Sequence, residues 1–339
     1  MSLMLDEARS APELIREQLR RNAPTMADLG EQLRQSPPVS ALTVARGSSD
    51  HAASYFAYLC MKQHGIPVAS LPPSLTTLAK APWRASGHLA LAVSQSGQSP
   101  DLIATQQALA TGGARTLALL NTLESPLGAA SDTEIPLHAG EEKSVAATKS
   151  YLATLSAMAQ LLGHWSEDRS LLTALEGLPE RLEKALEQDW TPAVEAFQSA
   201  DRMMVIGRGA GLAVAQEAAL KFKETCAIQA EAFSGAEVRH GPMALIGPGY
   251  PVLVFAPPGP EQAGLLTLAE WLEGVGAQVL LAADASVANR QLTLLDAGHD
   301  DLQPLSVIQS FYVMVAALAA ARGSDPDRPR HLNKVTCTL

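Results

Sequence analysis

Short apolar runs alternate with longer amphipathic stretches along most of the chain. Asp6 to Gln35 carries apolar residues at three- and four-residue spacings, which predicts a helix. A further helix is predicted from His51 to Gln63, and others lie between the later runs. Strands that alternate with helices predict a parallel sheet covered on both faces. The five runs of strand length are Val39 to Ala45, Val68 to Leu71, Leu89 to Val93, Thr116 to Leu120 and Glu134 to Leu137.

The same pattern starts again in the second half of the chain. After a long helix predicted over Ser144 to His164, a strand is expected at Arg202 to Ile206. It leads into an Arg-Gly turn at Arg208 that repeats the Arg-Gly turn at Arg46. We therefore predict an α/β protein made by internal duplication, each half a mainly parallel sheet flanked by helices in three α/β/α layers. The predicted domains are residues 1–175 and 176–339.

The turn after the third apolar run has the chemistry of an anion site. Its side chains able to contact an anion are Ser94, Gln95, Ser96 and Ser99. Ser99 takes the N-cap position of a helix predicted over Asp101 to Ala110, and a helix N-terminus attracts anions. The nucleotide signatures GxGxxG and GxxxxGK[ST] are both missing here. We interpret the turn as a phosphate cradle, although an ordinary serine-rich turn fits the same residues.

The matching turn of the second half lacks this chemistry. After the strand predicted at Val252 to Ala256 come Pro257, Pro258, Gly259 and Pro260. Because prolines contribute no N–H donors, the anion site is expected in the first half only.

Three charged residues share one face of the helix predicted over Ala213 to Thr225. Glu217, Lys221 and Glu224 follow one another at spacings of four and three. A solvated face with one ion pair is one interpretation. The small apolar residues around them favour a buried helix instead, and buried carboxylates need partners or a task.

Two further groups are candidates for chemistry. The stretch from Ala230 to Pro242 has poor periodicity, so we expect a folded loop, and it presents His240 before a Gly-Pro turn. An imidazole there is suited to act as a general acid or base, although a loop histidine is often merely exposed. Lys334 stands in the C-terminal tail and is either a tail charge or a group brought into a site.

Composition and charge narrow the class of protein. The chain has 339 residues, a formal net charge of −10 and three cysteines, which are Cys60, Cys226 and Cys337. The acidic charge argues against a nucleic-acid partner, and the cysteines have neither metal-type nor disulfide-framework spacing. No run of 18 apolar residues occurs, and the stretch from Val313 to Ala321 is too short to span a bilayer. We expect a cytoplasmic protein with no membrane partner.

Seven motifs, taken in order, resemble those of the SIS (sugar isomerase) superfamily, and specifically the isomerase half of glucosamine-6-phosphate synthase. They are Gly-Ser-Ser at 47–49, Ser-Gln-Ser-Gly at 94–97, Val-Ala-Ala-Thr-Lys at 145–149, Glu-Ala-Ala-Leu-Lys-Phe-Lys-Glu at 217–224, Ala-Glu-Ala-Phe at 230–233, Arg-His-Gly-Pro at 239–242 and Pro-Arg-His-Leu-Asn-Lys at 329–334. The resemblance covers nearly the whole chain and implies two tandem SIS subdomains.

The resemblance also implies roles for individual residues. Glu224 matches the base that moves a proton between C1 and C2 of the sugar, and Glu217 a second acid near it. His240 matches the residue that opens the sugar ring, lent by the other subunit of a homodimer. Lys334 matches the lysine that meets the open-chain carbonyl, and Lys221 a supporting polar group. The implied phosphate ligands are Ser49, Ser94, Gln95, Ser96 and Ser99, and further substrate contacts are implied for Ser48, Val145 and Thr148.

One departure from the synthases bears on the expected reaction. They begin with a glutamine-hydrolysing domain that has an N-terminal cysteine, whereas Met1 to Met4 leads straight into the first predicted helix. We therefore expect the reverse chemistry, a glucosamine-6-phosphate deaminase that releases fructose 6-phosphate and ammonia without a metal or organic cofactor. A galactosamine-6-phosphate deaminase, a plain phosphosugar isomerase and a sugar-phosphate-binding regulatory protein remain as alternatives.

Overall fold

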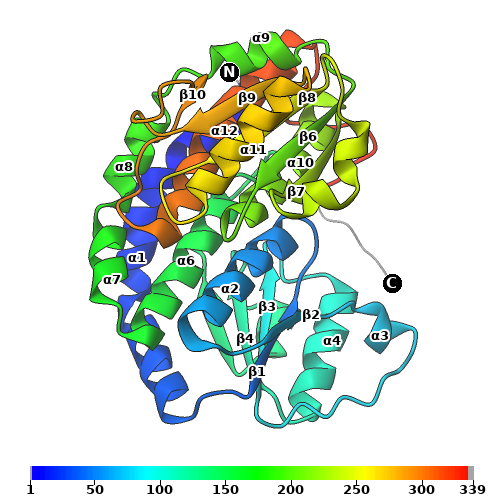
Figure 1. The fold of residues 1–339 in the computed structure, drawn as a ribbon. Helices are drawn as coiled ribbons and strands as arrows, with labels where there is room; N and C mark the ends of the chain where they lie inside the picture. Colours follow the sequence, from blue (N-terminus) through cyan, green and yellow to red (C-terminus); the bar gives the residue numbers. More distant parts are fainter. Residues whose placement is uncertain (1, 335–339) are drawn as a thin grey trace. The chain divides into compact units, whose positions relative to one another are not determined.

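The computed structural model describes residues 2–334, and their contacts divide the chain into two compact units. The N-terminal unit comprises residues 13–142, 149–175 and 333–334. The C-terminal unit comprises residues 2–12, 143–148 and 176–332. Each unit is built on one five-stranded sheet with helices on both of its faces (Figure 1).

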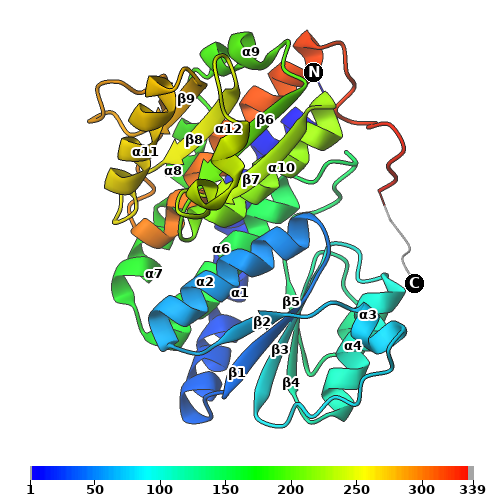
Figure 2. The ribbon, with the colours of Figure 1, turned by 45° about the vertical axis from the view of Figure 1, so that its right-hand side comes forward.

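All strands of the N-terminal sheet are parallel, in the order β2-β1-β3-β4-β5. Helix α2 packs against α6 on one side of this sheet, and α4 covers the other side together with α3 and α5 (Figure 2). The strands are β1 (Ser40–Val44), β2 (Val68–Ser70), β3 (His88–Ser94), β4 (Arg115–Leu120) and β5 (Thr133–Pro136). The helices are α2 (Ser48–His64), α3 (Ser74–Thr77), α4 (Pro100–Thr111), α5 (Pro126–Ala129), α6 (Lys149–Ser166) and α7 (Arg169–Glu176), preceded by α1 (Leu3–Gln35).

The C-terminal sheet is also parallel and repeats the same strand order, β7-β6-β8-β9-β10. Helices α10 and α12 pack together on one side of it, and α11 covers β8 and β9. The strands are β6 (Arg202–Gly207), β7 (Gln229–Ser234), β8 (Pro251–Ala256), β9 (Gln278–Ala283) and β10 (Leu292–Thr293). The helices are α8 (Leu178–Ala185), α9 (Thr191–Phe197), α10 (Gly211–Cys226), α11 (Gln262–Gly274) and α12 (Gln303–Ala321), with three 3₁₀ turns at Glu237–His240, Pro242–Leu245 and Asp300–Leu302. The predicted fold class, two tandem parallel α/β/α units, is confirmed.

The helix predicted from Ser144 begins five residues later, at Lys149, so the prediction was wrong for residues 144–148. The backbone N–H groups of Ser144 and Val145 donate to residues far away in the chain instead of to a helix of their own. The Glu7 carboxylate accepts hydrogen bonds from the amides of Lys143 and Ser144, and the Val145 amide donates to Asp327 O at 3.4 Å. These bonds join residues 143–145 to Glu7 and Asp327, which belong to the same C-terminal unit.

The prediction of a loop over Ala230 to Pro242 was also wrong for the first part of that segment. Residues 229–234 form the edge strand β7, which pairs in parallel with β6. An edge strand has a neighbour on one side only, and just one of the six residues of β7 is buried. The weak periodicity of the segment therefore reflects its exposure, and only the residues after Ser234 lack regular strand structure.

Helix α12 forms the apolar centre of the C-terminal unit. The helix over residues 300–321 is long and apolar enough, by length and composition, to cross a membrane. However, 78% of the 18-residue window that meets this criterion is buried inside the fold. Its neighbours are α8, α9 and α10, and Phe311 packs edge-on against Phe222 with ring centroids 5.1 Å apart. Burial of this extent is what the core helix of a compact unit shows.

The close approach of α1 to the end of α6 leaves room only for a glycine. A Cβ atom on Gly30 would lie 2.7 Å from the backbone carbon and 2.9 Å from the backbone oxygen of His164. Because the obstacle is backbone, it cannot move as a side-chain rotamer would. We predict that Gly30→Ala lowers the free energy of unfolding by about 1–3 kcal/mol, as overpacking does. Gly274→Ala is the matched helical control, since nothing lies within 4 Å of its added Cβ. Urea denaturation that finds the two variants equally stable would contradict this packing.

Candidate active site

The predicted phosphate-binding residues follow the carboxyl ends of β1 and β3, which are adjacent in the N-terminal sheet. From β1 the chain moves to β2 on one side, and from β3 it moves to β4 on the other. In open parallel sheets this change of direction creates a crevice where ligands bind. Ser48 and Ser49 open α2 directly after β1, and Ser94 to Ser99 connect β3 to α4. The N-termini of α2 and α4 thus follow the carboxyl ends of two adjacent strands.

The anion turn, residues 94–99, is held in one shape by its own bonds. Ser94 is buried and its Oγ accepts a hydrogen bond from the Gly97 amide at 3.0 Å. Gly97 adopts φ +64°, and a Cβ there would overlap the Ser125 side chain. The Gly97 carbonyl accepts from the Leu127 amide at 3.2 Å. A glycine is therefore required at this position, and these hydrogen bonds fix the shape of the turn.

Within the turn the remaining predicted ligands differ in position. Ser99 occupies the N-cap position of α4 with Pro100 following, as predicted, but its side chain makes no capping hydrogen bond. The Ser96 Oγ accepts from the Gln98 amide at 3.3 Å. Gln95 and Ser49 are partly exposed. The turn therefore carries uncharged hydroxyl and amide side chains, of which Ser94 is buried and the other predicted ligands are partly exposed.

A charged residue at the same crevice was not assigned a role from the sequence. Arg46 follows β1, and its guanidinium binds the carboxylate of Asp101 in the first turn of α4, with Nη2 to Oδ2 at 2.9 Å and Nε to Oδ2 at 3.1 Å. The sequence did carry a signal for this pair. Arg46 stands just after β1, and Asp101 stands in the first turn of the helix that follows β3.

In the C-terminal unit α10 carries the acid–lysine cluster, defined as Glu217, Lys221 and Glu224. The Lys221 Nζ lies 3.1 Å from Glu217 Oε1 and 2.6 Å from Glu224 Oε2. The Lys221 and Glu217 side chains are almost fully buried, whereas that of Glu224 is 18% exposed. From α12, Tyr312 donates a hydrogen bond to Glu217 Oε1 at 3.3 Å. The interpretation of a solvated helix face is therefore wrong, because α12 covers it.

Two opposing effects act on the ammonium at the centre of the cluster. Burial lowers the pKa of Lys221, but the adjacent carboxylates of Glu217 and Glu224 raise it by more, so the net pKa lies above the ordinary value. Lys221 is therefore protonated at neutral pH, and its charge holds one oxygen of Glu224 in place. The other oxygen is left for a different partner.

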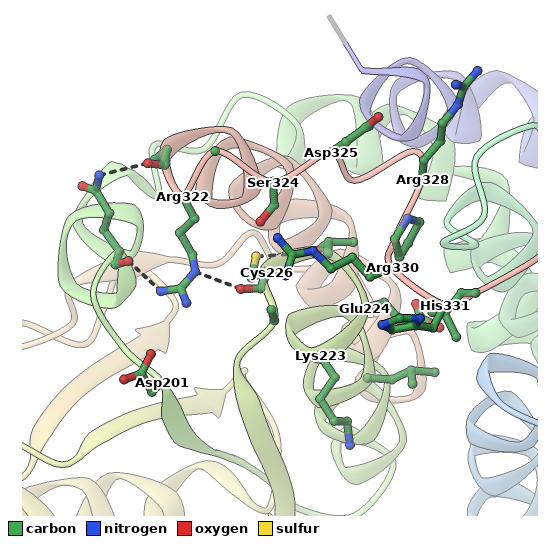
Figure 3. A pocket seen from close by; sticks show the side chains of 18 of the residues that line it. Asp201, Lys223, Glu224, Cys226, Arg322, Ser324, Asp325, Arg328, Arg330 and His331 are labelled. Atoms are coloured by element: carbon green, nitrogen blue, oxygen red, sulfur yellow. Dashed lines mark hydrogen bonds between the residues drawn. The ribbon is translucent and has the colours of Figure 1, made fainter.

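Glu224 opens into a cavity of about 990 Å³ formed within the C-terminal unit by the ends of α10 and α12 and the segment that follows α12. Around it lie Lys223, Arg328, Arg330 and His331 (Figure 3). Asp201 and Asp325 also line it, so the cavity carries charged side chains of both signs and is suited to polar ligands. Its size is within the range of small-molecule sites.

One arginine in the wall of this Glu224 cavity has a structural task. Arg322 donates to the carbonyl oxygens of Cys226 at 2.9 Å, Gln198 at 2.6 Å and Ala200 at 2.9 Å, so it ties α12 to the ends of α9 and α10 (Figure 3). The Cys226 thiol is also buried, and burial raises its pKa to about 11. It is therefore protonated at neutral pH and is not a nucleophile.

The other predicted residues lie outside the Glu224 cavity. His240 is exposed on the 3₁₀ turn that follows β7. Lys334, the last residue described, lies in the N-terminal unit with its Nζ 3.7 Å from Oε2 of the buried Glu142. Thr148 is fully buried and Val145 partly so. Cys337 lies outside the described residues.

A family model described as "SIS domain" matches the chain twice, over residues 33–163 and 196–321. The chain belongs to the SIS domain family. The two matches coincide with the two sheets, and the resemblance expected from the motifs is confirmed. The chain is 30% identical to the glutamine–fructose-6-phosphate aminotransferase (isomerizing) of Thermococcus kodakarensis, over 98% of this chain and 57% of that protein. This SIS protein thus spans little more than half the length of that relative.

Two solved structures extend the comparison. A candidate phosphosugar isomerase of Silicibacter pomeroyi is 42% identical, with a TM-score of 0.91, covering 96% of this chain and all of that one. The glucosamine-6-phosphate deaminase of Thermotoga maritima is 22% identical, with a TM-score of 0.78, covering 99% of this chain and all of that one. The second likeness concerns the fold alone.

We predict that Lys221→Met destabilises the SIS protein by about 3–5 kcal/mol, because removing the ammonium leaves buried carboxylate charge without a partner. Adding Glu217→Gln to this variant should recover part of the loss, since it removes the buried charge that was left uncompensated. Lys223→Met, an exposed lysine two residues away, is the control. Urea denaturation followed by tryptophan fluorescence measures all three. Equal stability of the two lysine variants would show that the cluster contributes no stability.

Proposed function

We propose that this SIS protein is a phosphosugar isomerase whose substrate is an amino sugar phosphate, and that it acts as a glucosamine-6-phosphate deaminase. The observation that carries the proposal is the carboxylate of Glu224, held at one oxygen by a buried ammonium 2.6 Å away and opening into a polar cavity. A base that shuttles a proton between adjacent carbons needs this combination of fixed orientation and access.

In the proposed reaction Glu224 removes the proton from C2 of the open-chain amino sugar, and the electron pair forms an enolamine with C1. The C1 oxygen takes up a proton, and Glu224 returns its proton to C1. This gives a ketimine at C2 and a hydroxymethyl group at C1. Water adds to the ketimine carbon, the C–N bond breaks, and fructose 6-phosphate and ammonia leave. No electrons are gained or lost overall, so the shift needs no redox cofactor.

The anion turn supports the phosphate half of this substrate. A phosphate monoester carries a charge between about −1.5 and −2 at neutral pH and presents three acceptor oxygens. Hydroxyl donors and two helix N-termini at one crevice match that charge and geometry. We assign Ser49, Ser94, Gln95, Ser96 and Ser99 as phosphate ligands and Ser48, Val145 and Thr148 as further substrate contacts.

The names of the relatives agree with this substrate class. The Thermococcus kodakarensis relative is named for fructose 6-phosphate and the Thermotoga maritima structure for glucosamine 6-phosphate. We further propose that His240 opens the sugar ring and is lent by the partner in a homodimer, which agrees with its exposed position. Lys334 is assigned to the open-chain carbonyl, and the cytoplasm to the protein's location.

We predict ammonia release from glucosamine 6-phosphate together with an equal amount of fructose 6-phosphate. Galactosamine 6-phosphate is tested beside it, with tagatose 6-phosphate as the product. Turnover of the galacto epimer alone would reassign the substrate. Aldose–ketose exchange of a sugar phosphate without ammonia would show a plain isomerase. Heat stabilisation by either amino sugar phosphate with no turnover would show a binding protein.

We predict that Glu224→Gln lowers kcat by about 100-fold or more while the Kd for the substrate changes little, because the amide keeps the shape and loses the base. Glu270→Gln, an exposed glutamate on α11, is the control and should keep full activity. Retained turnover in the Glu224 variant would remove this residue from the mechanism.

A further inference from the structure

The anion turn consists of uncharged groups, whereas the phosphate group that we propose binds there is a dianion. An uncharged cradle on a chain of net charge −10 lacks a permanent positive charge of its own. The structure places one at the same crevice. Arg46 follows β1, one of the two strands that border the crevice, and reaches the first turn of α4, which begins directly after the N-cap Ser99.

The carboxylate that anchors this arginine is built into the fold. Asp101 is only 1% exposed, and its Oδ1 accepts a hydrogen bond from the Leu102 amide at 2.9 Å. Its Oδ2 accepts both bonds from Arg46, at 2.9 Å and 3.1 Å. A buried carboxylate fixed by the helix backbone therefore determines where the guanidinium lies.

The anchoring leaves most of the guanidinium available. A guanidinium has five N–H donors, and the two bonds to Asp101 use one on Nε and one on Nη2. The side chain of Arg46 is 52% exposed although its partner is buried. An arginine held at one edge and open at the other matches a phosphate, which guanidinium binds through paired N–H donors.

We propose that Arg46 is a phosphate ligand of this crevice and that Asp101 is its positioning residue. The assignment rests on the proposed function for the identity of the sugar, but it requires only that the crevice binds a phosphate group. Arg46 supplies the permanent charge and the serine hydroxyls supply the shape. The crevice thereby selects phosphorylated over unphosphorylated sugars.

The test uses inorganic phosphate as the probe, so it does not depend on turnover. Isothermal titration or thermal stabilisation gives the Kd for phosphate of the wild type and of Arg46→Gln, Arg46→Lys and Asp101→Asn. Loss of a charge-assisted hydrogen bond predicts a Kd about 10- to 100-fold higher for Arg46→Gln. Arg46→Lys keeps the charge without the fork and should be intermediate. Arg208→Gln, at the matching turn of the C-terminal unit, is the control and should bind phosphate as the wild type does.

Asp101→Asn should weaken phosphate binding while Arg46 is present and have little further effect once Arg46 is glutamine. A merely structural Asp101 would instead lower stability equally in both backgrounds and leave the Kd for phosphate unchanged. If Arg46→Gln does not fold, Arg46→Lys and Asp101→Asn decide the matter by the same Kd.

Wild-type affinity for phosphate in folded Arg46 variants would overturn the assignment, whatever sugar the enzyme uses. Where a sugar phosphate is turned over, Arg46→Gln should raise KM with kcat nearly unchanged. Weakened phosphate binding in a protein that turns over no amino sugar phosphate would leave the role of Arg46 intact and refute only the proposed function.

Discussion

The buried ammonium of Lys221 between two carboxylates is the interaction on which the C-terminal unit depends. Removing three charges from water is costly, and only close pairing makes such a cluster tolerable. The small residues Ala218 and Ala219 on α10 are buried beside it, and Tyr312 of α12 donates to the more deeply buried carboxylate. The packing of α10 against α12 therefore also determines how Glu224 is oriented. A group suited to proton transfer results from a constraint of the core.

Duplication produced two sheets of the same strand order, and their crevices then diverged in chemistry. After β3 the N-terminal unit has serine and glutamine side chains, whereas after β8 the C-terminal unit has Pro257, Pro258 and Pro260. Prolines remove the N–H donors that an anion needs. The C-terminal unit instead carries its chemistry on one helix. The same scaffold thus carries a serine-rich turn in one copy and a buried acid–lysine cluster in the other.

The two units also differ in the charged side chains near these residues. The anion turn combines uncharged side chains with an arginine whose charge is partly balanced by Asp101. The Glu224 cavity is bordered by Lys223, Arg328, Arg330 and His331 in a protein that is acidic overall. Asp201 and Asp325 line the same cavity, so charged side chains of both signs surround Glu224.

Local sequence by itself determined most elements of this protein. Continuous apolar runs such as Leu89 to Val93 are typical of strands buried on both faces, and spacings of four and three placed Glu217, Lys221 and Glu224 on one helix face. The turn from Ser94 to Ser99 could likewise be predicted, because its glycine and its N-cap residue act on their immediate neighbours. Membership of the SIS family followed from motifs of this local kind.

Only the tertiary structure decided which of these groups meet. The pair Arg46 and Asp101 joins residues far apart in the chain, and it exists because β1 lies beside β3 in the sheet. The Ser144 amide, predicted to lie in a helix, donates to Glu7 instead, and the strand β7 depends on pairing with β6. Burial of the acid–lysine cluster depends on α12. The periodicity of a segment depends only on its own residues. These features depend on contacts with residues elsewhere in the chain, which that periodicity does not specify.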